Sequence, residues 1–371
     1  MRMRVLIIGA GMLGASTAYH LAQLGAEVEI VDEEHQGKAT LAGAGIVCPW
    51  ATKADEPQWY EMYAAGARYY DTLIEGLKER GETSIGYGKV GALVVAEEEA
   101  EFDAAEERVL RRTKDVPEAG TISKLTPEEA RKLFPPLRED MPAIHISGAA
   151  RVDARLLAAA MLRAAVSLGA TFRRDNVTLA MKDDKPVCIG SSGEVIEADE
   201  IIVTAGAWAS RILQPLGLHH PVQPQKGQIV HLSLPGVATA KWPVILPMGS
   251  HYMLSFDDSR VVIGATREDS SGFDYRVTAA GEHEVLSAGL KIAPGLANAT
   301  HIETRIGFRP AAPTIRPILG RVPGIQGLTV GNGLGASGLT VGPFAGKCLA
   351  DLVAGKNLSA SLDAYAPQGR A

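Results

Sequence analysis

The chain has 371 residues, of which 46% are hydrophobic and 22% charged, a composition typical of a soluble globular protein with room for two packed domains. Its 37 basic and 43 acidic residues give a net charge of −6 without a basic stripe, which argues against nucleic acid as a partner. No run of about 18 apolar residues predicts a membrane span.

The three cysteines, Cys48, Cys188 and Cys348, are odd in number, widely spaced and outside any Cys-x-x-Cys motif. No group of histidines and cysteines has the spacing of a zinc site either. We therefore expect buried free thiols, no metal, and a reducing compartment, the cytoplasm.

The N-terminal residues predict a βαβ unit. A strand over 4–8 is followed by a glycine-rich turn over 9–14, a helix from about 12 to 24, a strand over 27–31 and then Asp32. This order of strand, turn, helix, strand and acid matches the fingerprint of dinucleotide-binding folds.

The glycines of this turn are expected to have separate roles. Gly9 permits the tight turn, Gly11 lets a pyrophosphate approach the backbone, and Gly14 lets the helix pack on the strand. The helix N-terminus offers free N–H groups and a partial positive charge. Asp32 is placed to accept hydrogen bonds from ribose hydroxyls, and its charge disfavours the extra phosphate of NADP. Flavin and nicotinamide dinucleotides share this fingerprint, so it leaves the choice between them open.

The next segment, EEHQGKATLAGAGIVCPW over 33–50, is a small-residue loop where an NAD dehydrogenase typically continues with another βα repeat. Here the chain resembles the FAD-dependent D-amino-acid oxidase family, which includes glycine oxidase, sarcosine oxidase and bacterial D-amino-acid dehydrogenases. The resemblance implies a noncovalently held FAD whose ribityl chain and ring pass along this loop.

Later segments extend the resemblance. Residues 151–177 predict an amphipathic helix and a short strand, after which the backbone of Val177 is implied at the adenine. The stretch ADEIIVTAGAW over 198–208 predicts a buried strand that ends in small residues beside the cofactor. The glycine-rich turn in 331–343 precedes a helix predicted over 344–353, and N–H groups there suit the electron-rich edge of a reduced flavin.

The motifs and the resemblance together place one set of residues at the cofactor, drawn from both ends of the chain. These residues are Gly9, Gly11, Met12, Leu13, Gly14, Asp32, Glu33, Thr40, Leu41, Gly45, Ile46, Val47, Val177, Ala205, Gly206, Trp208, Gly333, Gly335, Ala336, Ser337, Gly338, Leu339 and Thr340.

The predicted fold is α/β, with a discontinuous Rossmann-type FAD-binding domain and an α+β substrate domain. Alternating strand blocks over 222–265 predict an antiparallel sheet that roofs the flavin, and the charged residues 97–133 predict peripheral helices joined by a loop. The predicted FAD-binding domain consists of residues 1–85, 149–217 and 304–371, and the predicted substrate domain of residues 86–148 and 218–303.

Two residues are candidates for the catalytic site. Arg309, in Gly-Phe-Arg-Pro, has the planar fork that binds a carboxylate bidentately, and it matches the family arginine that grips the substrate. Tyr252, in HYMLSF, matches a family tyrosine that closes on the substrate. His251 beside it is expected on the other face of the strand.

The expected activity is oxidative deamination of a small amino acid or secondary amino acid, of the glycine or D-amino-acid type, by hydride transfer from the substrate Cα to flavin N5. Two alternatives stay open: a 2-hydroxy-acid oxidoreductase, and an FAD-binding subunit of a hetero-oligomeric amine dehydrogenase. The lysine of sarcosine oxidase-like members is missing from RVVIGAT (260–266), so O2 and a quinone-type acceptor are both open. The sequence also leaves open a homo-oligomer.

Overall fold

The structure is a computed structural model that describes residues 2–369. A six-stranded sheet forms one half of the molecule, with the strand order β19-β20-β13-β1-β2-β9. Five of its strands are parallel, and the edge strand β19 is antiparallel to β20. The strands are β1 (Arg4–Ile8), β2 (Glu27–Asp32), β9 (Thr171–Arg174), β13 (Glu200–Val203), β19 (Ile318–Arg321) and β20 (Leu328–Asn332).

Helices cover this sheet because their small and apolar residues can pack closely on it. The first helix, α1 (Met12–Gln23), is buried almost throughout and lies between α6 (Ala154–Ser167) and α9 (Gly338–Val353). Helix α3 (Pro57–Glu79) packs on α9. The βαβ unit predicted for the N-terminus is therefore confirmed, with α1 ending one residue earlier than expected.

An eight-stranded sheet forms the other half, in the order β18-β14-β17-β16-β15-β5-β7-β6. All its neighbouring strands are antiparallel except β15 and β5. Its elements are β5 (Ala92–Val95), β6 (Ile122–Leu125), β7 (Ala143–Ile146), β14 (Gln223–Ser233), β15 (Val244–Pro247), β16 (Tyr252–Ser255), β17 (Arg260–Gly264) and β18 (Thr300–Ala311), with helices α4 (Glu99–Thr113), α5 (Pro127–Leu133) and α8 (Ala279–Ile292).

The expected antiparallel sheet over 222–265 is confirmed, but the expectation for residues 97–133 is wrong in part. The segment between α4 and α5 is not a plain loop, because it contains β6, which pairs with β7 at the edge of the sheet. Its two central residues, Ser123 and Lys124, are exposed and polar, so the strand lacks the alternation that would have revealed it.

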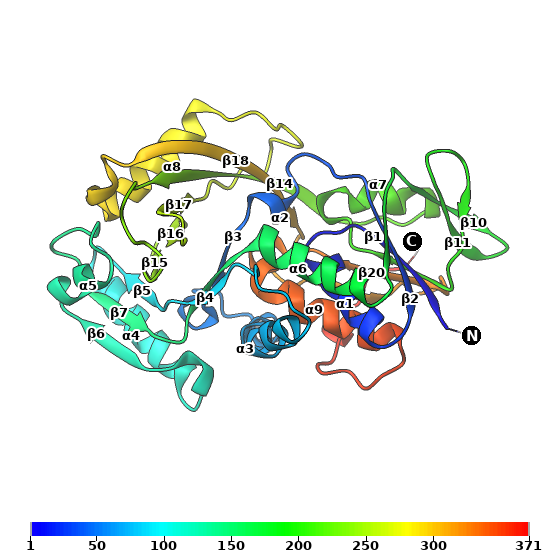
Figure 1. The fold of residues 1–371 in the computed structure, drawn as a ribbon, viewed down its shortest axis with the longest axis horizontal. Coiled ribbons are helices and arrows are strands. Elements are labelled where there is room, and N and C mark those ends of the chain that lie inside the picture. Colours follow the sequence, from blue (N-terminus) through cyan, green and yellow to red (C-terminus); the bar gives the residue numbers. More distant parts are fainter. Residues whose placement is uncertain (1, 370–371) are drawn as a thin grey trace.

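Shorter elements join the two halves (Figure 1). Strands β3 (Ala44–Val47), β8 (Ala150–Asp153) and β4 (Tyr87–Lys89) form a small sheet in the middle of the molecule. Helix α2 (Ala39–Ala42) packs against β18 and α6, and helix α7 (Ala209–Leu213) packs near β10. A three-stranded antiparallel sheet contains β10 (Thr178–Lys182), β11 (Lys185–Ile189) and β12 (Val195–Ile196).

The strands β14 and β18 are the longest pair and extend from the eight-stranded sheet toward the middle of the molecule (Figure 1). Strand β18 crosses the boundary expected at residue 304, and the division into two domains stays a prediction. All three cysteines are free and buried. Within residues 2–369, no helix is long and apolar enough to cross a membrane.

Candidate active site

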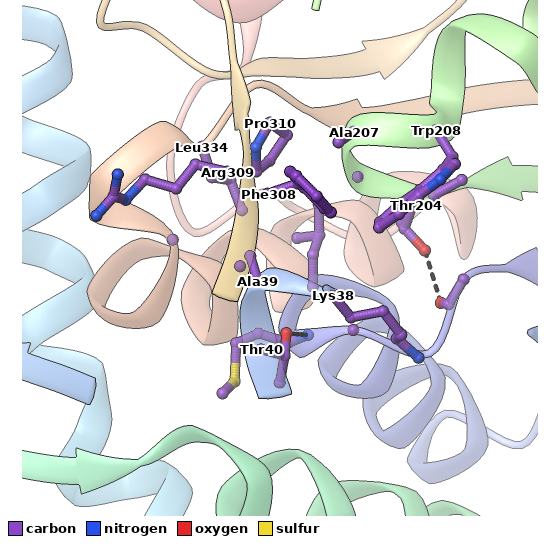
Figure 2. Close-up of a pocket in the computed structure, with 18 of the residues that line it drawn as sticks. Lys38, Ala39, Thr40, Thr204, Ala207, Trp208, Phe308, Arg309, Pro310 and Leu334 are labelled. Carbon is purple, nitrogen blue, oxygen red and sulfur yellow. Dashed lines mark hydrogen bonds between the residues drawn. The ribbon is translucent and has the colours of Figure 1, made fainter. Parts of the chain in front are cut away.

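The turn after β1 packs against the end of β13. Gly9 has a φ of +107°, and a Cβ there would lie 2.6 Å from the carbonyl oxygen of Thr204. A Cβ on Gly14 would lie 1.9 Å from the carbonyl oxygen of Gly9. The Thr204 hydroxyl donates to that same oxygen at 2.9 Å (Figure 2). Both glycines therefore permit a close approach of α1 to the sheet that no other residue allows.

Asp32 lies at the end of β2 with only 6% of its surface exposed. Its carboxylate accepts hydrogen bonds from the backbone N–H of Ala10 at 2.6 Å and of Glu34 at 2.6 Å. It also forms an ion pair with Lys38, whose Nζ is 2.7 Å away. This lysine was not anticipated, because it lies in a loop segment with no spacing rule. It compensates the charge of a carboxylate that is almost removed from water.

An elongated pocket starts beside Asp32. It passes the first turn of α1 and ends at the turn before α9, so both ends of the chain contribute its walls. Gly206 and Gly335 line it with φ values of +54° and +48°, and a Cβ on either would meet no atom within 4 Å. A carboxylate at one end, helix N-termini along the wall and glycines that leave the space clear together fit a dinucleotide such as FAD.

The turn between β20 and α9 lines the far end of the pocket. Helix α9 begins at Gly338, so the expectation that this helix starts at 344 is wrong. Pro343 lacks the N–H that would donate to the carbonyl of Leu339 in a regular helix. The hydroxyl of Tyr70, on α3, donates to that carbonyl in its place. The helix therefore tolerates the proline, which in the sequence looks like a boundary.

Arg309 and Tyr252 come together at the junction of this pocket with a second one. Arg309 Nη1 donates to the carbonyl oxygen of Thr266 at 3.0 Å and to Gln225 Oε1 at 3.3 Å. Two glycines make room for these side chains, since a Cβ on Gly227 would lie 2.8 Å from Arg309 Nη2 and one on Gly264 would lie 2.6 Å from the Tyr252 ring.

Arg309 and Tyr252 each shift the pKa of the other, although burial is the main cause of both shifts. Burial lowers the pKa of Arg309, while Tyr252 raises it. Burial raises the pKa of Tyr252, and the charge of Arg309 opposes that rise. Among residues 2–369, no carboxylate lies within ion-pair distance of Arg309, although the more distant Asp269 opposes the effect of burial on its pKa. A half-buried guanidinium therefore faces the pocket without a direct ion-pair partner.

The second pocket extends from Arg309 and Tyr252 toward Thr52, Lys53 and Met248. His251 also lines it, but its Nε2 lies 3.3 Å from the Glu284 carboxylate of α8. Helix α8 packs with Met253 and not with Tyr252, which agrees with the expectation that His251 points to the other face of the strand. No cluster of three or more His, Cys, Asp or Glu in residues 2–369 could hold a metal ion.

The structure brings most of the residues expected at the cofactor to these two pockets. Those that line the first are Gly9, Gly11, Met12, Leu13, Asp32, Glu33, Thr40, Val177, Ala205, Gly206, Trp208, Gly335, Ala336, Gly338 and Leu339. Those found only in the second are Ile46, Gly333, Ser337 and Thr340.

Four of the expected residues line neither pocket: Gly14, Leu41, Gly45 and Val47. Leu41 is 48% exposed. Gly45 and Val47 alternate along β3 with residues that do line the pockets, so they face the core instead. A Cβ on Gly45 would lie 2.2 Å from Val152 Cγ1. Glycine there serves packing against β8.

Several residues of the pocket were not expected from the sequence. Phe308 lies next to Arg309 on β18, and its ring meets that of Trp208 edge to face, with 6.1 Å between centroids. The His35 ring stacks on the Trp208 ring, with 4.4 Å between their centroids. Figure 2 shows the Arg309 side chain reaching away from this aromatic group. Only the tertiary fold brings these segments together.

Thr40 connects the loop after β2 to the helix. Its hydroxyl accepts a hydrogen bond from the backbone N–H of Met12 at 3.0 Å, at the first turn of α1 (Figure 2). The site therefore presents a hydroxyl beside the helix N-terminus, which suits a phosphate group.

Comparison with solved structures identifies near relatives. The iminodiacetate oxidase IdaA from Chelativorans sp. BNC1 is 68% identical with a TM-score of 0.98, covering 99% of this chain and 100% of the other. A glycine oxidase from Geobacillus kaustophilus is 28% identical with a TM-score of 0.86 and 98% coverage of both chains.

Comparison with curated sequences agrees. An uncharacterized oxidoreductase of Bacillus subtilis, YurR, is 48% identical over 98% of both chains. A glycine oxidase of Pseudomonas aeruginosa is 30% identical over 99% of both. A family model described as FAD dependent oxidoreductase matches residues 4–352. The resemblance found in the sequence is thereby confirmed: the chain belongs to the DAO family of FAD-dependent oxidoreductases, and FAD is its cofactor.

Proposed function

We propose that this oxidoreductase oxidises the Cα–N bond of a small amino acid, primary or secondary, that carries a free carboxylate. The observation that carries the proposal is Arg309, a half-buried guanidinium at the junction of the two pockets that has no carboxylate ion-pair partner among residues 2–369. A substrate carboxylate would supply the missing charge and match the fork of the guanidinium.

The surroundings of Arg309 support a substrate held beside the cofactor. Tyr252 and Arg309 line both pockets, as do Gly335, Ala336 and Leu339 of the turn before α9. A molecule bound to Arg309 in the second pocket therefore shares a wall with the cofactor pocket. Such a shared wall supports direct contact between the substrate and the redox group, which positioning requires.

The relatives support the same chemistry. The names glycine oxidase and iminodiacetate oxidase specify two compounds that share an N–CH2–carboxylate unit. When bound, the flavin would accept a hydride from this carbon. The amine loses its N–H proton to solvent, and water hydrolyses the resulting imine to an amine and a 2-oxo acid. Both relatives are named oxidases, which favours O2 as the electron acceptor of this protein.

An anaerobic absorbance titration of the purified single chain with FAD tests the proposal. Glycine, N-methylglycine, iminodiacetate and D-alanine are added in turn, with glycolate as the matched hydroxy acid. Bleaching by one of the amino acids and not by glycolate is the expected result, and rapid return of colour in air identifies an oxidase. Bleaching by glycolate alone would favour the hydroxy-acid alternative, and no bleaching at all by the single chain would overturn the proposal.

A further inference from the structure

A second arginine lines the outer part of the substrate pocket. Arg267 follows β17 and shares the second pocket with Arg309 and Gln225. Unlike Arg309 it is exposed. Within residues 2–369 its guanidinium has no hydrogen-bond or ion-pair partner, although most other arginines around it have one. The second pocket therefore has an unpaired cation on its wall, in the same pocket as Tyr252.

The backbone on both sides of Arg267 is hydrogen-bonded to residues near Arg309. The carbonyl of Thr266, the preceding residue, is the acceptor of Arg309 Nη1 at 3.0 Å. On the other side, Glu268 exchanges two backbone hydrogen bonds with Lys226 of β14, at 3.1 Å and 3.0 Å. The position of Arg267 relative to Arg309 is therefore set by the sheet and not by a free loop.

Side-chain hydrogen bonds fix this segment further. The carboxylate of Glu268 accepts from Gln228 Nε2 at 2.8 Å and from the Thr266 hydroxyl at 2.7 Å. The buried Lys226 donates to the carbonyl of Arg276 at 2.8 Å and lies 3.6 Å from Glu268. Glu268 is thus used inside the segment and does not neutralise Arg267.

The charges around the two arginines do not balance within the pocket. Burial is the main cause that lowers the pKa of Arg309, and the positive charge of Arg267 adds to it; the same charge opposes the rise that burial gives to the pKa of Tyr252. Asp269, two residues after Arg267, accepts a hydrogen bond from Gln225 Nε2 at 2.7 Å, and its charge only partly opposes the lowering of the Arg309 pKa by burial. Arg309 and Arg267 are like charges in one pocket, so their mutual repulsion decreases when anions bind there. A ligand with two carboxylates can pair with both guanidinium groups, whereas a ligand with a single carboxylate can pair with only one.

We propose that Arg267 binds a second carboxylate, so that the substrate is an amino dicarboxylic acid in which a secondary amine links two carboxymethyl groups. This inference rests on the proposed function and names the substrate class of the same site. Arg309 holds the carboxylate next to the carbon that is oxidised, and Arg267 holds the other one at the pocket mouth. Oxidation followed by hydrolysis of the imine then releases glyoxylate and glycine. Arg267 is then the residue that distinguishes a dicarboxylic substrate from a monocarboxylic one.

The test is a calorimetric titration of the FAD-loaded protein with two ethers that have no amine to oxidise. Oxydiacetate has two carboxylates, and methoxyacetate has one on a similar skeleton. We expect oxydiacetate to bind the wild-type protein about tenfold or more tighter, in line with one charge-assisted hydrogen bond at a partly exposed site. Arg267→Gln should abolish that preference and leave the Kd of methoxyacetate unchanged, and Arg267→Lys should restore part of it.

A matched control separates a specific contact from a general loss of charge. Arg111 is also exposed and lies beyond the second pocket, so Arg111→Gln removes the same charge without touching the site. It should keep the preference for oxydiacetate. The same variants should split in kinetics: Arg267→Gln raises the KM for iminodiacetate about tenfold and leaves that for N-methylglycine unchanged.

The outcomes distinguish this inference from the function on which it rests. Equal affinity of the wild-type protein for the two ethers, or an unchanged preference in Arg267→Gln, would overturn the role of Arg267. Tight, Arg267-dependent binding of oxydiacetate without oxidation of any amino acid would instead overturn the proposed function.

Discussion

The hydroxyl of Tyr70 donates to the carbonyl of Leu339, which is the acceptor that Pro343 leaves without a backbone donor. The two residues lie on different helices, α3 and α9, and Tyr70 is fully buried. The hydrogen bond therefore stabilises the first turns of α9, which line the substrate side of the site.

Tyr70→Phe should lower the free energy of unfolding by about 1–3 kcal/mol, because a buried carbonyl would lose its partner. Urea unfolding of the FAD-loaded protein measures this change. The second substitution Pro343→Ala restores a backbone N–H for Leu339 and should recover part of the loss in the Tyr70→Phe background. If Pro343→Ala has the same effect in both backgrounds, the two residues do not share this carbonyl.

The Asp32 carboxylate offers a test of cofactor binding. Asp32→Ala removes the acceptor expected for the ribose hydroxyls and leaves Lys38 unpaired, so the Kd for FAD should rise roughly tenfold or more. Quenching of FAD fluorescence during reconstitution gives the Kd, and circular dichroism checks the fold. Glu34→Gln removes one negative charge nearby, from a side chain that pairs with Arg174, and should leave the Kd unchanged. Unaltered FAD affinity in Asp32→Ala would contradict the ribose role.

The parts of this site that could be predicted from the sequence are those in which local spacing carries the physics. The glycines at 9, 11 and 14 and the acid at 32 are specified within one βαβ unit, and the structure places them as that unit requires. Arg309 was found through its motif. That it has no carboxylate within ion-pair distance was not visible in the sequence, because this depends on strands β14 and β18 and on the segment after β17.

The missed features have physical reasons of two kinds. Some contradict a local rule that tertiary contacts override, as when Tyr70 compensates for Pro343 or when the polar edge strand β6 pairs with β7. Others depend on contact between distant segments, as with Lys38 on Asp32 and Phe308 against Trp208. Neither kind leaves a periodic signal in one sequence.

The buried histidine His20 should make stability depend on pH. Burial is the main cause that lowers its pKa to about 4, and its ring contacts Gln23 at 3.0 Å and the Tyr69 hydroxyl at 2.8 Å. An unfolded histidine titrates near 6.5, so the unfolded chain binds the extra proton first as the pH falls. The free energy of unfolding should therefore be highest above pH 6.5 and decrease between pH 6.5 and 4. His20→Gln should show a smaller decrease in urea unfolding at pH 7 and pH 5; an identical decrease would assign it to other groups.

The guanidinium of Arg309 is the most direct test of the substrate side. Arg309→Met keeps much of the volume but removes the charge and both donors, so kcat/KM for the best amino-acid substrate should fall about 10- to 150-fold, the equivalent of about 1.5–3 kcal/mol. Arg309→Lys should recover only part of the loss, because an ammonium group cannot form the bidentate fork. Stopped-flow reduction of the bound FAD separates binding from the hydride step. An unchanged kcat/KM in Arg309→Met, with FAD fully bound, would show that the substrate carboxylate is held elsewhere in the pocket.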